Sequence, residues 1–314
     1  MPVDQHVVLN VWGPICALIS SFTWAIGSHR FALLSHQFSP ARISLTRGLV
    51  GFLSFFVLGV FVCMIEGVTP ASLFVGMTER HLLLYALSML SSYALGDLSF
   101  FQSTKYIGVS SALALGSTYP IFTTAFGAVF NGDIPSLLQS FALIIAVTGI
   151  VLIVKGQKEQ PVKHTRKIDL FKGLSLAALA GFGWAMNAFA TAQSTLGGPS
   201  LTVACGLRMG IAAFLCVFTA RATSRYFGKP LPWSVTKKFL WVFVAESFIG
   251  TVVYFYGFKH SPLALGTILA SLAPLILFMY EVGTGREKLS IQKLAGVIAC
   301  VGGVVALSIT SRGH

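Results

Sequence analysis

Two carboxylates lie inside long apolar segments of the sequence, where an ionised side chain is costly. Asp97 falls within the segment 82–104 and Glu246 within the segment 239–258, both near mid-depth. A carboxylate in such a place can take up and release a proton, or it can form an ion pair with a buried arginine or lysine. We therefore predict a role in proton coupling or in a structural ion pair, and the residue types fit both.

Two arginines lie in comparable apolar surroundings. Arg47 belongs to the segment 43–65 and Arg208 to the segment 201–220. They could serve as counter-ions for a substrate carboxylate or phosphate, or they could pair with the buried carboxylates or extend to the lipid headgroups. The structural interpretation is the favoured one.

Large aromatic residues form a second candidate group. Trp24 and Trp184 lie well inside their apolar segments, and Asn187 is close to the second of them. A pair of indoles facing a cavity can stack on a flat or apolar substrate, although most aromatic residues of such a chain face the core or the lipid. We predict that these three residues line a substrate cavity.

Two prolines mark a third group. Pro120 and Pro274 fall near the middle of their segments, where proline frees a backbone carbonyl and kinks a helix. Ser117, Tyr119 and Ser271 place hydroxyl groups beside them. Matched interruptions of this kind indicate a binding site, whereas hydroxyls that bond back to their own helix would make the kinks purely structural. The two interpretations are compatible.

The elements that must position these residues are transmembrane helices. Of the 314 residues 55% are hydrophobic and 10% are charged, against about 25% charged in a soluble domain. This composition excludes a soluble globule, a disordered chain and, despite the net charge of +12, a nucleic-acid binder. An all-α integral membrane protein is predicted, with ten spans at 8–29, 43–65, 82–104, 109–130, 137–155, 172–193, 201–220, 239–258, 263–282 and 292–310.

The chain also repeats itself. A shift of 154 residues superimposes identical residues, Ser117 on Ser271 and Pro120 on Pro274. The same shift places the two carboxylates opposite hydroxyl residues, Asp97 on Thr251 and Ser92 on Glu246. A shift of 160 superimposes Trp24 on Trp184, and a shift of 161 superimposes Arg47 on Arg208. The chain thus divides into two five-span units, 1–155 and 172–314, joined by the basic linker 156–171. Because each unit crosses the membrane an odd number of times, the two units must enter the membrane from opposite sides. Such inverted repeats are characteristic of secondary transporters, whose substrate site lies where the repeats meet.

The segments FQSTKYIGVSSALALGSTYPIFTTAF and YGFKHSPLALGTILASLAPLILF resemble the EamA-type repeat of the drug/metabolite transporter superfamily. The resemblance covers nearly the whole chain. It implies ten helices and export or exchange of small metabolites by alternating access, without naming a substrate. Arg47 and Arg208 match an arginine that the family often carries in the second helix of each repeat. The span 8–29 lacks the carboxylate that related exporters of cationic drugs use, which disfavours that mechanism here.

Other chemistry finds little support in the sequence. The five cysteines lie in apolar stretches without a CxxC pair, the seven histidines do not cluster, and no GxxxxGK motif followed by Ser or Thr is present. We therefore expect no metal, no cofactor and no built-in ATPase. Seventeen of the 22 Lys and Arg residues fall on the side opposite the termini, so the positive-inside rule predicts termini outside the cytoplasm, contrary to the usual picture of the family.

The sequence thus predicts a multi-pass protein of the inner or plasma membrane that moves a small organic metabolite, more often outward, without ATP. Its partners would be that solute and membrane lipid, and a monomer is compatible with the sequence. One alternative is a receptor or scaffold that binds without transporting. The other is a membrane-embedded lipid-modifying enzyme, which is disfavoured because the motifs HExxH, GxSxG and DxxxD are missing from the apolar segments.

Overall fold

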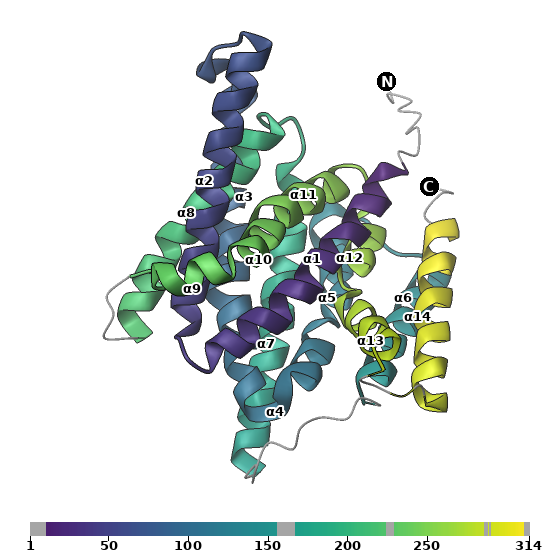
Figure 1. Cartoon of the computed structure of the whole chain (residues 1–314). Helices are drawn as coiled ribbons and strands as arrows, with labels where there is room; N and C mark the ends of the chain where they lie inside the picture. Colours follow the sequence, from purple (N-terminus) through teal and green to yellow (C-terminus); the bar gives the residue numbers. More distant parts are fainter. Residues whose placement is uncertain (1–10, 156–166, 224–228, 286–287, 289, 311–314) are drawn as a thin grey trace, which may run out of the picture.

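The computed structural model describes residues 11–155, 167–223, 229–285, 288 and 290–310, and all regular structure within them is helical (Figure 1). The α-helices are α1 (Trp12–Ser35), α2 (Pro40–Glu66), α3 (Glu79–Met89), α4 (Leu98–Gly116), α5 (Tyr119–Phe126), α6 (Leu137–Lys155), α7 (Lys167–Ser194), α8 (Leu201–Thr223), α9 (Trp233–Lys238), α10 (Leu240–Val244), α11 (Thr251–Lys259), α12 (Leu263–Ala270), α13 (Ala273–Gly283) and α14 (Ile291–Thr310). A 3₁₀ turn, η1 (Pro70–Phe74), and three π-helical segments, η2 (Leu90–Asp97), η3 (Gly127–Asn131) and η4 (Ala245–Gly250), complete them.

Alone or joined end to end, most of these helices form runs that are long and apolar enough to cross a membrane. Eight runs in the described part of the chain meet both conditions: Pro40–Glu66, Glu79–Val109, Ser111–Asn131, Lys167–Ser194, Leu201–Thr219, Leu240–Lys259, Leu263–Gly283 and Ile291–Thr310. The shorter apolar stretch Leu137–Ile153 and the 24-residue helix α1 occupy the two remaining predicted positions. The predicted all-α, multi-pass membrane fold is confirmed.

The first helices of the two halves run in opposite directions. In Figure 1, α1 descends from the upper right, whereas α7 begins at the bottom of the molecule and rises. Equivalent helices of the two halves pack together, α2 against α8 and α6 against α14. Each first helix packs on the other half, α1 against α11 and α12, and α7 against α4 and α5. The halves are therefore interleaved, and residues at the centre come from both.

The predicted linker between the halves is described only in part. Residues 156–166 lie outside the described residues, and 167–171 form the first turns of α7. The exact boundaries of the repeats thus stay a prediction.

Four of the runs are interrupted near mid-depth, in matched pairs. The π-helical segment η2 separates α3 from α4, and η4 separates α10 from α11. Helices α4 and α12 end at Gly116 and Ala270, and the chain restarts at Tyr119 and Ala273 with Pro120 and Pro274 in the first turn. A proline is tolerated there because its missing N–H has no partner in a first turn. The predicted kinks are therefore complete breaks.

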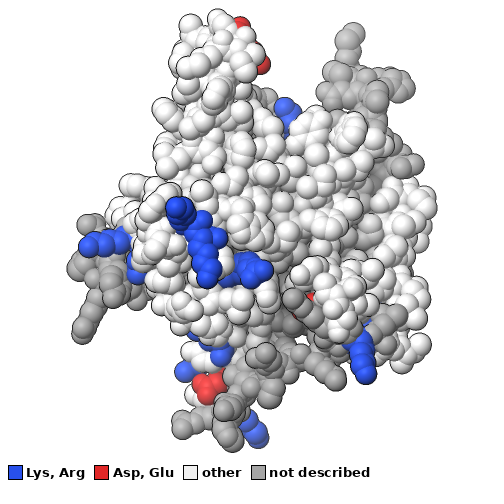
Figure 2. Space-filling model, in the orientation of Figure 1, with Lys and Arg blue, Asp and Glu red and all other residues white. Residues whose placement is uncertain are grey.

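Polar and apolar residues are distributed as a membrane requires. Large apolar side chains are exposed along the outer helices, and many serines and threonines are buried inside. Figure 2 shows a mostly uncharged face on which Lys and Arg lie mainly at the middle and lower levels. The orientation of the termini relative to the cytoplasm stays a prediction.

Close packing of α6 on α14 generates a test of the fold. A Cβ added at Gly303 would lie 2.6 Å from the backbone of Ala142 and of Ala146, whereas one added at Gly302 would meet nothing within 4 Å. We expect Gly303→Ala to lower the free energy of unfolding by about 1–3 kcal/mol through overpacking. Gly302→Ala, the matched control, should leave stability unchanged or raised, because alanine is the better helix former. Thermal unfolding in detergent measures both, and equal melting temperatures would contradict the packing described.

Candidate functional site

A cavity of about 120 Å³ lies between the two halves, where the interrupted runs meet. Its wall is built by α1, α2, α7, α8 and α11, by the π-helical segments η2 and η4, and by the chain breaks beside α5 and α13. Ten of the predicted residues line it: Trp24, Arg47, Asp97, Ser117, Tyr119, Trp184, Asn187, Arg208, Glu246 and Ser271. The other two, Pro120 and Pro274, begin α5 and α13 next to the lining residues Tyr119 and Ser271.

The strongest polar contact in the cavity joins one arginine to two carboxylates. Arg47 donates from Nε to Glu246 Oε2 at 3.0 Å and from Nη2 to Oε1 at 2.6 Å, and its Nη1 donates to Asp97 Oδ2. The side chains of Arg47 and Asp97 are 2% exposed and that of Glu246 is 12% exposed. We call these three residues the charged triad. It joins α2 and η2 of the first half to η4 of the second.

Neighbouring groups hold the carboxylates of the charged triad in place. Trp184 Nε1 donates to Asp97 Oδ1 at 2.9 Å, and Ser247 Oγ donates to Glu246 Oε2 at 2.9 Å. The Arg47 guanidinium carbon lies 4.4 Å from the ring centroid of Tyr93, within the range of a cation–π contact. With both carboxylates ionised the triad carries one excess negative charge, so one proton can bind there without leaving Arg47 unpaired.

The second arginine has a different environment. Arg208 donates from Nε to Ser88 Oγ at 3.3 Å, and from Nη2 to Asn187 Oδ1 at 3.1 Å and Thr191 Oγ1 at 2.9 Å. Its Nη1 atom is buried without a hydrogen-bond partner, and within the described part of the chain it forms no ion pair. The structure thus pairs Arg47 with both carboxylates, and among the described residues Arg208 forms hydrogen bonds with neutral groups.

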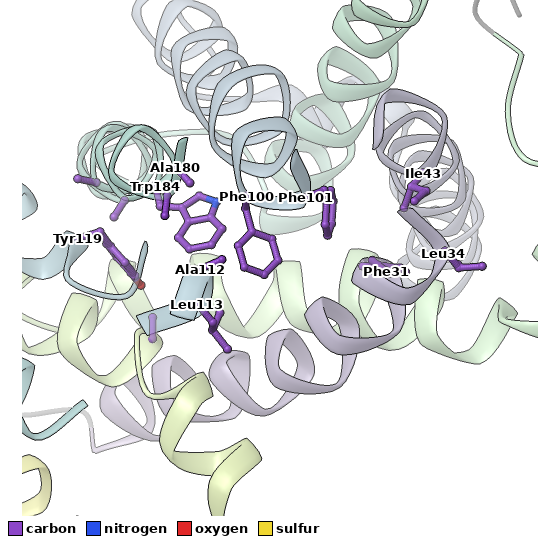
Figure 3. Packing of buried hydrophobic residues seen from close by; sticks show 14 of the residues in the cluster. Phe31, Leu34, Ile43, Phe100, Phe101, Ala112, Leu113, Tyr119, Ala180 and Trp184 are labelled. Carbon is purple, nitrogen blue, oxygen red and sulfur yellow. The ribbon is translucent and has the colours of Figure 1, made fainter. Parts of the chain in front are cut away.

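The two repeat-related tryptophans meet across the cavity. Trp24 and Trp184 lie edge to face with their ring centroids 5.5 Å apart. The Trp184 indole also packs against Phe100 at 5.4 Å and Tyr119 at 6.3 Å, and Figure 3 shows these rings in one cluster. A Cβ added at Gly96 would lie 2.7 Å from the indole, so this glycine is needed to make room for Trp184.

The residues that carry hydroxyls at the two breaks, Ser117, Tyr119 and Ser271, all line the cavity. Ser271 Oγ donates to Ile268 O at 2.7 Å, which is the local bond expected of a purely structural break. Ser117 and Tyr119 line the cavity at the equivalent break. The local bond of Ser271 fits a structural break, and the position of Ser117 and Tyr119 in the cavity wall fits a binding site.

Several lining residues were not singled out in the sequence, among them Ser20, Thr23, Ser92, Tyr93, Thr251 and Tyr254. The repeat offered a signal for two of them. Thr251 and Ser92 are the repeat partners of Asp97 and Glu246, and all four residues line the cavity. Tyr93 and Tyr254 have no comparable signal, because aromatic residues are abundant throughout the chain.

Comparison with known proteins identifies the family. The profile of the EamA-like transporter family matches residues 11–155 and again residues 171–309. The chain belongs to the EamA-like transporter family. The two matches correspond to the two predicted repeats, and the resemblance of the sequence to this family is thereby confirmed.

Individual relatives add a little more. An uncharacterised transporter of Archaeoglobus fulgidus is 29% identical over 140 residues, which are 44% of this chain and 46% of that protein. The match thus spans less than half of that relative. A solved crystal structure, described only as that of a protein, has a TM-score of 0.72 at 15% identity and covers 96% of this chain and 97% of its own. That likeness shows the EamA fold and nothing about a substrate.

The charged triad generates a test of its structural weight. Removing one partner of a buried ion pair leaves an uncompensated charge, so Arg47→Met should lower the free energy of unfolding by about 3–5 kcal/mol. Adding Asp97→Asn and Glu246→Gln to Arg47→Met should restore much of the loss, because no buried charge then remains in the triad. Thermal unfolding in detergent compares the single and triple variants. A triple variant less stable than Arg47→Met alone would contradict the arrangement.

Proposed function

We propose that this EamA-family protein is a secondary transporter that moves a small organic solute by alternating access, with a proton exchanged at Asp97 or Glu246. The observation that carries the proposal is the central cavity, whose wall both repeats supply and which holds the charged triad. A site between inverted repeats can be opened to either side by movement of one repeat against the other.

The contacts between the repeats suggest how a proton could act. Glu246 and Trp184 of the second repeat bind Arg47 and Asp97 of the first. Protonation of a carboxylate replaces an ionic contact with a weaker neutral one, and so lowers the free energy needed to separate the repeats. The ionisable groups that face the two carboxylates are Arg47, Tyr93 and, on α8, Cys216.

The interrupted helices support the same proposal. The carboxylates lie in η2 and η4, which are π-helical segments of equivalent runs, and π-helical turns occur frequently at functional sites. Helices kink at π-bulges, so the runs can bend at these segments. The breaks before Pro120 and Pro274 give each repeat a second bending point.

Transport by the protein in liposomes tests the proposal. Purified full-length protein is reconstituted, and uptake of labelled amino acids, nucleosides, phosphorylated sugars and organic cations is measured with and without a pH gradient. We expect at least one class of solute to accumulate inside the liposomes. A gradient of one pH unit supplies about 1.4 kcal/mol per proton, so one coupled proton can support up to about tenfold accumulation of the solute. Saturable binding without flux for every class would contradict transport and favour a receptor.

The coupling role has its own variants. Asp97→Asn or Glu246→Gln should abolish the stimulation of solute uptake by a pH gradient. Exchange of solute should still be measurable when the pH is the same on both sides of the membrane. Glu66→Gln is the matched control, because Glu66 is an exposed carboxylate at the end of α2 and should leave coupling intact. Unchanged pH dependence in both cavity variants would refute proton exchange at these carboxylates.

A further inference from the structure

We propose that the transported solute carries a carboxylate or phosphate group and that Arg208 binds this group in the cavity. The inference rests on the proposed transport function and adds a substrate class to it. Its basis is the difference between two arginines at repeat-related positions.

Arg47 and Arg208 lie in equivalent helices, α2 and α8, and each is 2% exposed. Arg47 is neutralised by two carboxylates, whereas Arg208 is surrounded by neutral acceptors. The ionisable groups that face Arg208 are Tyr85, Tyr93, Cys205 and Tyr254, which do not supply a negative charge at neutral pH. Within the described residues no carboxylate contacts this buried cation.

The unpaired atom of Arg208 belongs to a residue of the cavity wall. Nη1 is buried and has no hydrogen-bond partner, although buried donors are nearly always paired. Ser88, Asn187 and Thr191 occupy Nε and Nη2 and hold the guanidinium in one orientation. An oxygen of a bound anion would accept a hydrogen bond from Nη1 and would place a negative charge next to the guanidinium.

A second donor stands close to this position. Tyr254 Oη accepts a hydrogen bond from Asn187 Nδ2 at 3.1 Å, so its own proton is available to another acceptor. The ring of Tyr254 lies 6.0 Å from the Arg208 guanidinium carbon, and both residues line the cavity. Carboxylates and phosphates accept such bonds in charge-assisted form, and these bonds are about twice as strong as those that a neutral amide accepts.

The rest of the wall sets the size and polarity of the attached group. Trp24 and Trp184 provide an apolar, aromatic surface in the same cavity. Cavities of about 150 Å³ accommodate benzene, so a cavity of about 120 Å³ limits the body of the solute to about that size or smaller in this conformation. A small organic anion with an apolar body fits both conditions.

Binding of matched probes tests the inference even while the natural solute is unidentified. Purified full-length protein is titrated at constant ionic strength with benzoate and benzamide, with propionate and propionamide, and with phenylphosphonate. We expect at least one acid to bind and to raise the melting temperature by about 2–4 °C near saturation, while its neutral counterpart binds at least tenfold more weakly. Carboxylate binding alone would identify carboxylates as the class, and phosphonate binding alone would identify phosphate esters.

Variants of the arginine localise the effect. Arg208→Gln should weaken acid binding at least tenfold, Arg208→Lys should retain part of it, and both should leave amide binding unchanged. Arg80→Gln is the control, since Arg80 is exposed and bonds only to Gln193 among the described contacts. If Arg208→Gln does not fold, the ratio of acid affinity to amide affinity is compared between the wild-type protein and Arg208→Lys. A lower ratio in Arg208→Lys supports the anion site, and an equal ratio contradicts it.

Two results would overturn the inference: equal binding of acid and amide by the wild-type protein, or undiminished acid binding by a folded Arg208→Gln variant. The outcome is separable from that of the transport proposal. Acid binding without flux in liposomes would refute transport and leave the anion site standing. Flux of a neutral or cationic solute by a protein that binds no acid would refute only the anion site.

Discussion

The arrangement of the molecule depends on one buried ion pair between its halves. Arg47 holds Asp97 of its own repeat and Glu246 of the other, and all three side chains are withdrawn from water. Taking such ions out of water costs several kcal/mol for each, and the cost is recovered only when the geometry is good and further hydrogen bonds are present. The bidentate contact with Glu246 and the bonds from Trp184 and Ser247 meet that requirement. The triad therefore fixes how η2 and η4 face each other, and with them the cavity between the repeats.

The departure from symmetry is as informative as the symmetry itself. The backbone repeats closely, with equivalent helices packed in pairs and equivalent breaks before Pro120 and Pro274. The charges do not repeat: Asp97 and Glu246 both bind Arg47, whereas the partners of Arg208 in the described part of the chain are neutral. The duplicated scaffold thus gives repeat-related positions different electrostatic environments, and we propose that one of them exchanges a proton and the other binds the solute.

Much of this could be predicted from the sequence because membrane folding leaves strong signals. Long apolar segments locate the helices, and the shift of 160 residues pairs Trp24 with Trp184, which the structure places in contact. The breaks at mid-depth follow from prolines that cannot continue a helix. Asp97 and Glu246 could be named as candidate partners of the arginines, but which arginine they bind could not be predicted, because it depends on the rotation of helices in three dimensions. The π-helical segments likewise could not be predicted, because the glycines and serines in them lower helix propensity without specifying a π-turn.

The central claim is that the charged triad holds one exchangeable proton, and infrared difference spectroscopy of the reconstituted protein tests it most directly. On acidification, a protonated carboxylic acid gives a carbonyl band that is distinct from the bands of ionised carboxylates. The account predicts one such band in the wild-type protein, titrating over the pH range in which coupling changes, and its loss or shift in Asp97→Asn or Glu246→Gln but not in Glu66→Gln. A spectrum without that band across the range, or with the band unaltered in both cavity variants, would contradict the account.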